Sequence, residues 1–391
     1  MGISWAALTP IEISEQVAEE AQGQQAKESW FNTFNRSRDK FAEKYGTRFG
    51  FVFNYCQQAI LQGQNDEGKS RGLWYWNLDL SQQLWPGGSL IVEFEMDKNK
   101  GIDKFIPTYS LFNTNTGRNI AFYVPELYLE QSILQDKVYL AAGKLDLSDW
   151  FDANEVADSG DTKFLSNSLV LSQTIPFPTK GIGGMIKFQP NDYIYFQSGS
   201  STVESTATKV GLNRGFNSVF FINELGLSPK FGKLPGNYRF IFHLTRDNLD
   251  RINDDEGSIK NKDLGFGLSF DQALTSKITL FMRYGFADQK VRDIEHFWSF
   301  GVQVMELIPA RKFDCLGLGV AQSITGEDYR RANESEDLQV SRAETIYEAY
   351  YRIYLNEYIT LTPNIQMVTN PNADKAAANA IACGLRFLLS F

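Results

Sequence analysis

The last eleven residues of the chain, IACGLRFLLSF at 381–391, carry apolar side chains at every second position. This period of two predicts a β-strand with one apolar face, and the strand reaches the final residue, Phe391. Such a strand needs a partner, and the closure of a barrel supplies one. A soluble β-sandwich whose last strand ends in phenylalanine is the alternative that the rest of the sequence has to test.

The composition favours one large barrel over two or three ordinary domains. Aromatic residues make up 14% of the 391 residues, yet the mean hydropathy is −0.30, so many large apolar side chains coexist with a polar average. Strands with one lipid-facing row and one water-facing row produce this combination. No stretch approaches the roughly 20 consecutive apolar residues of a membrane-spanning helix, so we expect any crossing of a membrane to be made by strands.

Charge and reactive residues exclude several classes of protein. The formal charge is −9 and the basic residues are scattered, so we predict no nucleic-acid partner. Three cysteines, Cys56, Cys315 and Cys383, lie far apart in no ligand-like spacing, so we predict no disulfide framework, metal or cofactor. With only His243 and His296, and no GxSxG sequence, the chain is not predicted to be an enzyme.

The first 45 residues differ from the rest. Thr9, Pro10 and Glu12 are typical of the start of a helix, and the polar run that follows predicts a helical segment over 1–45. This segment is expected either to form a periplasmic arm or to plug the lumen. Residues 1–10 lack the basic start and apolar core of a secretory signal, so we expect the chain to begin near the mature terminus of an exported protein.

From residue 46 onward the apolar pattern has a period of two. Phe49, Phe51 and Phe53 alternate with smaller or more polar residues, and similar segments recur to the end of the chain, giving about sixteen strands. Their length, roughly ten residues, suits a tilted crossing of a bilayer. An even number of strands is typical of bacterial outer-membrane barrels.

Loop length alternates along the chain. Short turns follow every second strand, whereas the other connections are mostly longer and polar, with 288–294 as the weakest member of the series. A sandwich has no reason to sort its loops in this way. We therefore predict an all-β, antiparallel, up-and-down transmembrane β-barrel over 46–391. The longer connections are 57–70, 97–119, 145–181, 201–216, 246–260, 288–294, 325–342 and 368–378.

The longest connection, 145–181, is the main candidate for a functional loop. Its aromatic residues and prolines argue for an ordered structure, and long ordered loops are usually functional. A barrel of about sixteen strands is too wide for wall side chains to fill, so we expect this loop to fold into the lumen as a constriction. Trp150 and Phe151 would then narrow the path, while Asp146, Asp149 and Asp152 would set its charge.

Several motifs, in order, resemble a known family. The segments are ELYLEQ at 126–131, GKLD at 143–146, DWFD at 149–152, FLSN at 164–167 and the terminal strand 384–391, whose ending also resembles that of Gram-negative outer-membrane barrels. Together they resemble the OprB type of carbohydrate-selective porin. The resemblance covers about 46–391 and implies a sixteen-stranded outer-membrane channel for passive diffusion of monosaccharides and related small solutes.

The alternation also predicts which polar side chains line the path. If the bulky row faces lipid, charged residues of the other row point inward, where they exchange hydrogen bonds with hydrated sugars while aromatic faces stack on sugar rings. Inward acids would favour cations. Our predicted path residues are Arg48, Glu93, Glu95, Glu126, Glu130, Lys144, Asp146, Asp149, Trp150, Phe151 and Asp152.

Two other functions remain open from the sequence. One is a general or differently selective porin for other small organic solutes, and the other is a binding or structural barrel with a closed lumen. The expected partners are small saccharides, outer-membrane lipid and lipopolysaccharide, and the outer-membrane assembly machinery. The expected location is the outer membrane of a Gram-negative bacterium, as a monomer or a homotrimer.

Overall fold

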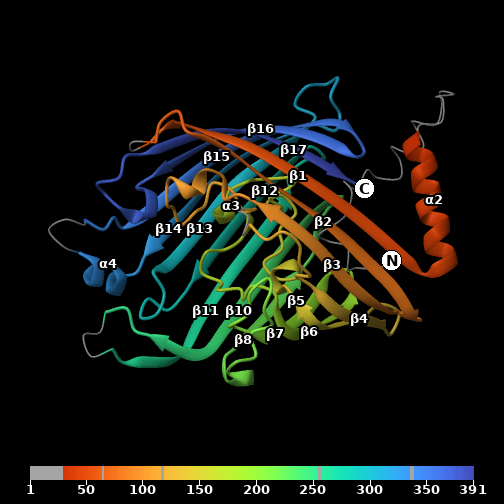
Figure 1. Ribbon diagram of the computed structural model, residues 1–391, viewed down its shortest axis with the longest axis horizontal. Coiled ribbons are helices and arrows are strands. Elements are labelled where there is room, and N and C mark those ends of the chain that lie inside the picture. The colour runs from red at the N-terminus through yellow and green to blue at the C-terminus, as the bar shows by residue number, and fades with distance from the viewer. Residues whose placement is uncertain (1–29, 64–65, 116–118, 254–256, 335–338) are drawn as a thin grey trace.

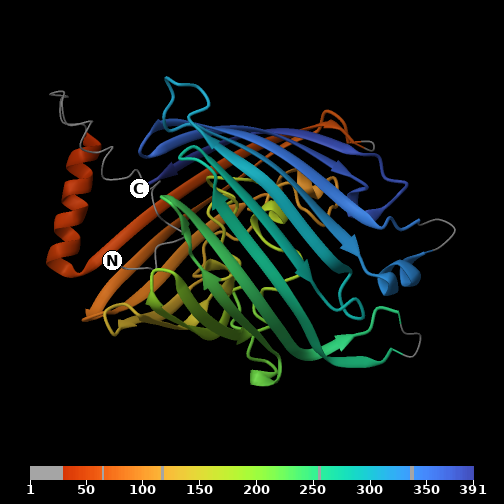
Figure 2. The ribbon, with the colours of Figure 1, turned by 180° about the vertical axis from the view of Figure 1, so that it is seen from behind.

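The computed structural model describes residues 30–63, 66–115, 119–253, 257–334 and 339–391. Most of them belong to one β-sheet that curls into a barrel with strongly tilted strands (Figures 1 and 2). The strands are β1 (Thr47–Gln62), β2 (Ser70–Trp85), β3 (Gly88–Lys98), β4 (Leu127–Ile133), β5 (Val138–Leu145), β6 (Gly181–Asn191), β7 (Ile194–Thr202), β8 (Val219–Leu227), β9 (Lys230–Phe231), β10 (Leu234–Asp250), β11 (Ile259–Ala273), β12 (Ile278–Phe286), β13 (Ile294–Met305), β14 (Cys315–Thr325), β15 (Ala343–Asn356), β16 (Ile359–Thr369) and β17 (Ala380–Ser390).

Helical segments are few in this part of the chain. The α-helices are α2 (Trp30–Tyr45), α3 (Asn167–Val170) and α4 (Glu327–Asn333), and the 3₁₀ turns are η1 (Gly101–Lys104), η2 (Leu147–Asp149), η3 (Gly215–Asn217) and η4 (Pro371–Ala373). None of the described helices is long and apolar enough to span a bilayer.

The barrel is closed by its first and last strands. β1 pairs antiparallel with β17, with Val52 opposite Ser390, and with β2 on its other edge. Phe391 extends the ladder, since its N–H donates to the carbonyl of Phe51 and its carbonyl accepts from the N–H of Phe51. The sheet has seventeen strands, but β9 is a two-residue strand in the turn between β8 and β10, so sixteen strands form the wall. The predicted fold is confirmed.

Alternation places polar side chains inside the wall and apolar ones outside. On β8, Phe221 and Leu225 are exposed on the outer face, whereas Glu224 between them is fully buried on the inner face. Closure leaves no open sheet edge, so the ladder satisfies the backbone groups of the wall strands even where no water is present. The wall is therefore suited to lipid outside and to polar groups inside.

Short and long connections alternate along the chain, as predicted. Turns as short as 86–87 and 192–193 lie at one end of the barrel, and loops such as 146–180 lie at the other. Three boundaries differ from the prediction by five residues or more. β1 continues to Gln62 and β10 to Asp250, beyond the predicted loop starts at 57 and 246, and β4 begins at Leu127 instead of near residue 120. Before Leu127, Tyr123 forms an isolated β-bridge with Glu95 outside the named strands, so the described residues of 99–126 belong to one long connection.

Helix α2 lies outside the barrel, beside the end at which β1 begins (Figures 1 and 2). Phe34 packs edge-on against Phe391, with ring centroids 5.1 Å apart, and lies 6.3 Å from the ring of Phe49. Asn35 donates a hydrogen bond to the hydroxyl of Tyr358 in the β15–β16 turn. The helix therefore does not fill the lumen. The predicted helix start at residues 9–12 lies outside the described residues.

Candidate functional site: the lumen and its inward loops

The loop at 146–180 is anchored inside the barrel by Arg283 of β12. Its Nε donates to Oδ1 of Asp152 over 3.0 Å, while its two terminal nitrogens donate to the carbonyl oxygens of Leu169 (3.1 Å) and Asp152 (2.9 Å). Both side chains of this ion pair are almost fully buried. Glu224 of β8 accepts from the N–H of Asp152 over 3.0 Å. Each of the three nitrogens of this buried guanidinium donates a hydrogen bond to the loop, which fixes the loop in one position.

A second anchor lies on β15 and β17. The carboxylate of Glu348 accepts from the N–H groups of Leu165 (2.7 Å) and Ser166 (2.9 Å). Arg386 donates to the carbonyl of Lys163 over 2.9 Å. Since β8 and β12 hold one part of the loop and β15 and β17 hold another, the loop folds across the interior of the barrel.

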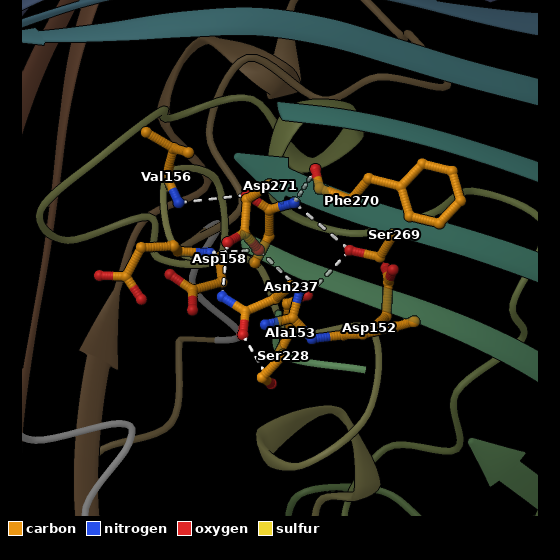
Figure 3. Close-up of polar contacts among 12 residues, drawn as sticks. Asp152, Ala153, Val156, Asp158, Ser228, Asn237, Ser269, Phe270 and Asp271 are labelled. Carbon is orange, nitrogen blue, oxygen red and sulfur yellow. Dashed lines mark hydrogen bonds and ion pairs between the residues drawn. The ribbon is translucent and has the colours of Figure 1, made fainter. Parts of the chain in front are cut away.

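Figure 3 shows a third set of contacts, where the loop meets β11. The hydroxyl of Ser269 donates to the carbonyl of Ala153 over 2.8 Å, and the side chain of Asn154 donates to the carbonyl of Phe270 over 3.1 Å. Asp271 next to them accepts from Asn237 over 2.6 Å. Wall side chains of these strands are thus used to hold the loop.

The loop at 99–126 also folds inward. Phe112 is fully buried and packs with Phe164 and Phe281 in an apolar cluster that includes wall residues of β12 to β17. Its backbone carbonyl accepts from Gln366 of β16 over 2.8 Å. The interior beside these strands is therefore filled by the two loops, and the polar interior that remains lies beside β2 to β5.

The polar interior beside β2 to β5 contains a cluster of carboxylates around the ammonium group of Lys180. Nζ of Lys180 lies 2.8 Å from Glu93, 3.0 Å from Glu126 and 4.0 Å from Glu95. Asp79 stands directly opposite Glu93 in the β2–β3 register, and its Oδ2 is buried without a hydrogen-bond partner.

Asp146 and Asp149, at the start of the loop, lie within electrostatic range of this group. Six carboxylates thus share one lysine. Within the described ranges, no His, Cys, Asp and Glu side chains are arranged to hold a metal ion.

The structure brings together five of the eleven predicted path residues. Glu93, Glu95, Glu126, Asp146 and Asp149 belong to the carboxylate cluster. Trp150 is half-buried and packs edge-on against Tyr128 at 5.6 Å between ring centroids. Glu130 lies nearer the short-turn end and accepts from the hydroxyl of Tyr139 over 2.9 Å.

Arg48 lies apart from this cluster. It is exposed on the inner row of β1, opposite Ser81 and at the end where the short turns lie.

Three predicted placements differ from the structure. Phe151 is fully buried, with its ring against Gly199 of β7, so it anchors the loop and lines no open path. Asp152 is buried in the ion pair with Arg283 and is not presented to solutes. Lys144 stands directly opposite Leu127 in the β4–β5 register, and Leu127 is exposed on the outer face of the barrel. Because paired residues lie on the same face of a sheet, Lys144 also lies on the outer face.

Lys144 joins two loops instead of lining the path. Its Nζ donates to the carbonyl oxygens of Val124 (3.2 Å) and Ala207. Lys180, in contrast, was missed by sequence reasoning. Lys180 is the only basic residue between 164 and 186, and it directly precedes β6. This isolated positive charge at the end of the loop is the sequence signal that could have identified it.

A closed wall of sixteen antiparallel strands with loops folded into its lumen defines an outer-membrane channel of the porin class. The chain belongs to the OprB family of carbohydrate-selective porins, whose family model matches residues 76–391. It is accordingly a β-barrel protein of the Gram-negative outer membrane.

Individual relatives are distant. The chain is 23% identical to Porin B of Pseudomonas aeruginosa over 52% of its length and 53% of that protein. It is 21% identical to Porin AaxA of Chlamydia muridarum over 66% of its length and 54% of that protein. The chain thus spans about half the length of these curated relatives.

Solved structures share the fold. The high-pH structure of Pseudomonas putida OprB superposes with a TM-score of 0.80 at 17% identity, covering 92% of this chain and 97% of that one. The outer-membrane channel DcaP of Acinetobacter baumannii gives a TM-score of 0.55 at 12% identity, covering 88% of this chain and 97% of that one. At these identities the likeness concerns the fold alone.

Proposed function

We propose that this protein is a passive diffusion channel for small neutral saccharides. The observation that carries the proposal is the loop at 146–180, which is fixed across the interior by buried polar contacts and leaves a polar side of the lumen beside β2 to β5. Charged groups there offer hydrogen bonds that replace the hydration of sugar hydroxyls, and Trp150 offers an aromatic face. Family membership supports the same class of solute.

The proposal is tested by liposome swelling combined with planar-bilayer conductance. Purified protein should pass glucose and xylose and exclude larger oligosaccharides. The absence of swelling with every monosaccharide would overturn the sugar proposal. If charged organic solutes permeate at least as fast as sugars, the protein is a general or differently selective porin instead. A complete absence of channel events would indicate a closed barrel.

The same proposal assigns the constriction of the channel to the loop at 146–180, called the inward loop below. Replacing 149–167 with a short Gly-Ser linker should leave a barrel that inserts, conducts several-fold more current and passes larger sugars. Strand pairing does not depend on this loop, and the wall charges that it releases become hydrated. Unchanged conductance would move the constriction to the loop at 99–126.

Further partners belong to the same proposal. The outer wall and outer loops are expected to contact lipid and lipopolysaccharide, and the barrel is expected to work as a monomer or homotrimer, which native mass spectrometry in detergent distinguishes. Phe391, which extends the last strand of the barrel, is expected to be recognised in the unfolded chain by the outer-membrane assembly machinery.

Phe391→Ala tests the role in assembly. Its backbone hydrogen bonds to Phe51 remain, and the loss of one ring costs a few kcal/mol at most, so refolded protein should stay stable. In cells, the amount of heat-modifiable barrel should fall strongly. Phe53→Ala, which removes an outward ring from β1, serves as the control. Normal membrane levels of the Phe391 variant would refute the role.

A further inference from the structure

A cavity of about 250 Å³ opens among the long loops, at the end of the barrel opposite the short turns. Four loops contribute to its lining: Asp66 follows β1, Phe105 follows β3, Tyr329 lies in α4 after β14, and Asn372 and Asp374 follow β16. The cavity is distinct from the carboxylate cluster around Lys180, none of whose members lines it.

The floor of the cavity is packed. Ile106, which lines it, is a member of the apolar cluster that fills the interior beside β12 to β17. The cavity therefore ends on a rigid apolar surface formed by the inward loops.

The walls of the cavity are held by one buried carboxylate. Glu344 of β15 is fully buried and accepts from the N–H groups of Tyr109 (3.0 Å), Ser110 (2.7 Å) and Asn372 (2.6 Å). It thereby joins the loop after β3 to the loop after β16. Three charge-assisted hydrogen bonds from backbone N–H groups to this one carboxylate fix both loops before any ligand arrives.

The loop after β16 also carries backbone strain at the lining residues. Asn372 and Ala373 have φ values of 56° and 54°, in the left-handed region that residues with a Cβ rarely adopt. The strained segment is retained by neighbouring contacts, since the carbonyl of Ala373 accepts from the N–H of Ser341 over 2.6 Å. Strained residues held by their surroundings are concentrated at functional sites.

The lining combines aromatic faces with hydrogen-bonding groups. The ring of Tyr329 is oriented by Tyr109, which meets it edge-on at 6.4 Å. Phe105 provides a second ring, and Nζ of Lys69 lies over one of its faces, 5.1 Å from the centroid. The carboxylates are already neutralised or engaged: Asp66 pairs with Lys69, and Asp374 accepts from the N–H of Ala376 over 2.8 Å. This lining favours a neutral, hydroxyl-bearing ligand with an apolar face over a free cation.

We infer that this cavity is a capture site that binds one monosaccharide ring before the solute enters the lumen. The inference rests on the proposed function, which supplies the class of solute. The volume lies below the range of about 300–1,000 Å³ that is usual for drug-sized ligands, so the site accommodates one sugar ring rather than an oligosaccharide. Ring stacking on Tyr329, with hydrogen bonds to the polar rim, gives this site its preference for sugars.

Binding is tested by saturation-transfer NMR of D-glucose with the full-length barrel in detergent micelles. Tyr329→Ala removes one ring on an exposed helix, and Asn372→Gly removes the amide while keeping a residue that tolerates positive φ. Each variant should weaken D-glucose binding by about tenfold. Tyr193→Ala, an exposed tyrosine in the turn between β6 and β7, is the matched control and should bind as the wild type does. Unaltered D-glucose binding in both cavity variants would overturn the inference.

Liposome swelling separates this inference from the proposed function. If the wild type passes glucose, the cavity variants should pass it more slowly at low glucose concentration and equally fast at saturating concentration, because the lumen itself is unchanged. Equal rates at all concentrations would overturn the capture site while leaving the channel function intact. If the wild type passes no sugar, the channel function fails, and loss of D-glucose binding in the variants still supports a sugar site.

Discussion

At the scale of single residues, Lys180 has the most unusual surroundings. Among the described residues, it is the one ammonium group within 4.0 Å of Glu93, Glu95 and Glu126, beside β2 to β5. Unpaired carboxylates in a narrow passage raise the local concentration of cations. The lysine offsets part of this negative potential and also ties the end of the inward loop to the wall.

Replacing this lysine should change ion selectivity. We expect Lys180→Gln to give a larger cation-selective reversal potential under a KCl gradient than the wild type, with the difference shrinking at high salt because mobile ions in the lumen screen the field of the cluster. Lys144→Gln is the matched control, since that lysine stands opposite the outward-facing Leu127 and lies outside the carboxylate cluster. A shift of equal size in both variants, or anion selectivity in the wild type, would contradict this account.

At the scale of elements, the inward loop depends on charges of the wall rather than on its own secondary structure. Arg283→Met should leave the Asp152 carboxylate buried without its cation, which typically costs about 3–5 kcal/mol. We expect the loop to undock for part of the time, so that single-channel records become noisy with excursions to higher conductance. Arg342→Met, at an exposed arginine after α4, should leave the current unchanged. Quiet records from the Arg283 variant would show that the loop is held by other contacts.

The turn between β13 and β14 contains a second ionic contact that can be tested by pH. Nε and one terminal nitrogen of Arg311 each lie 2.9 Å from Asp314, which also accepts from the N–H of Tyr354 (2.9 Å) and the hydroxyl of Tyr351 (3.0 Å). Burial raises the pKa of Asp314, but these hydrogen bonds outweigh it and hold the pKa below the usual value for aspartate. The folded state therefore binds this proton less readily than the unfolded state does.

The stability supplied by Asp314 is consequently present above the unfolded-state pKa of about 3.9 and is lost as pH falls through the lower folded-state pKa. We expect Asp314→Asn to lower the free energy of unfolding by about 1–2 kcal/mol at neutral pH, because Arg311 is partly exposed and solvent weakens the pair. Urea titration in micelles should show this difference narrowing in acid. A difference that is independent of pH would contradict the role of the charge.

The strands and loops were predictable from the sequence, whereas the placement of individual side chains such as Phe151 and Lys144 was not. The strands and the parity of their loops follow from local alternation, so both were predictable. The burial of Phe151 was not, because it depends on space left by Gly199, which the fold brings to it from β7. Lys144 was misplaced for a related reason: its nearness to the loop in sequence suggested a path residue, whereas the strand register with Leu127 decides its direction.

At the scale of the whole molecule, the seam between β1 and β17 is reinforced from outside by α2. Phe34→Ala should remove the ring that contacts Phe391 and Phe49 and cost about 1–3 kcal/mol, less than a fully buried phenylalanine because Phe34 is only half-buried. Thermal loss of heat-modifiability on gels should occur at a lower temperature. Phe41→Ala on the same helix, where the ring is exposed, should match the wild type. Equal transitions in both variants would mean that α2 does not support the seam.

The pairing of β1 with β17 also dictates an order of events during biogenesis. One edge of β1 has no partner until the last strand of the barrel, Ala380–Ser390, has been synthesised and exported. Every intermediate that precedes this step exposes a sheet edge open to pairing with other chains. A chain that lacks the segment Ala380–Ser390 is therefore not a slightly shortened barrel but an open sheet, whose free edges are prone to aggregation.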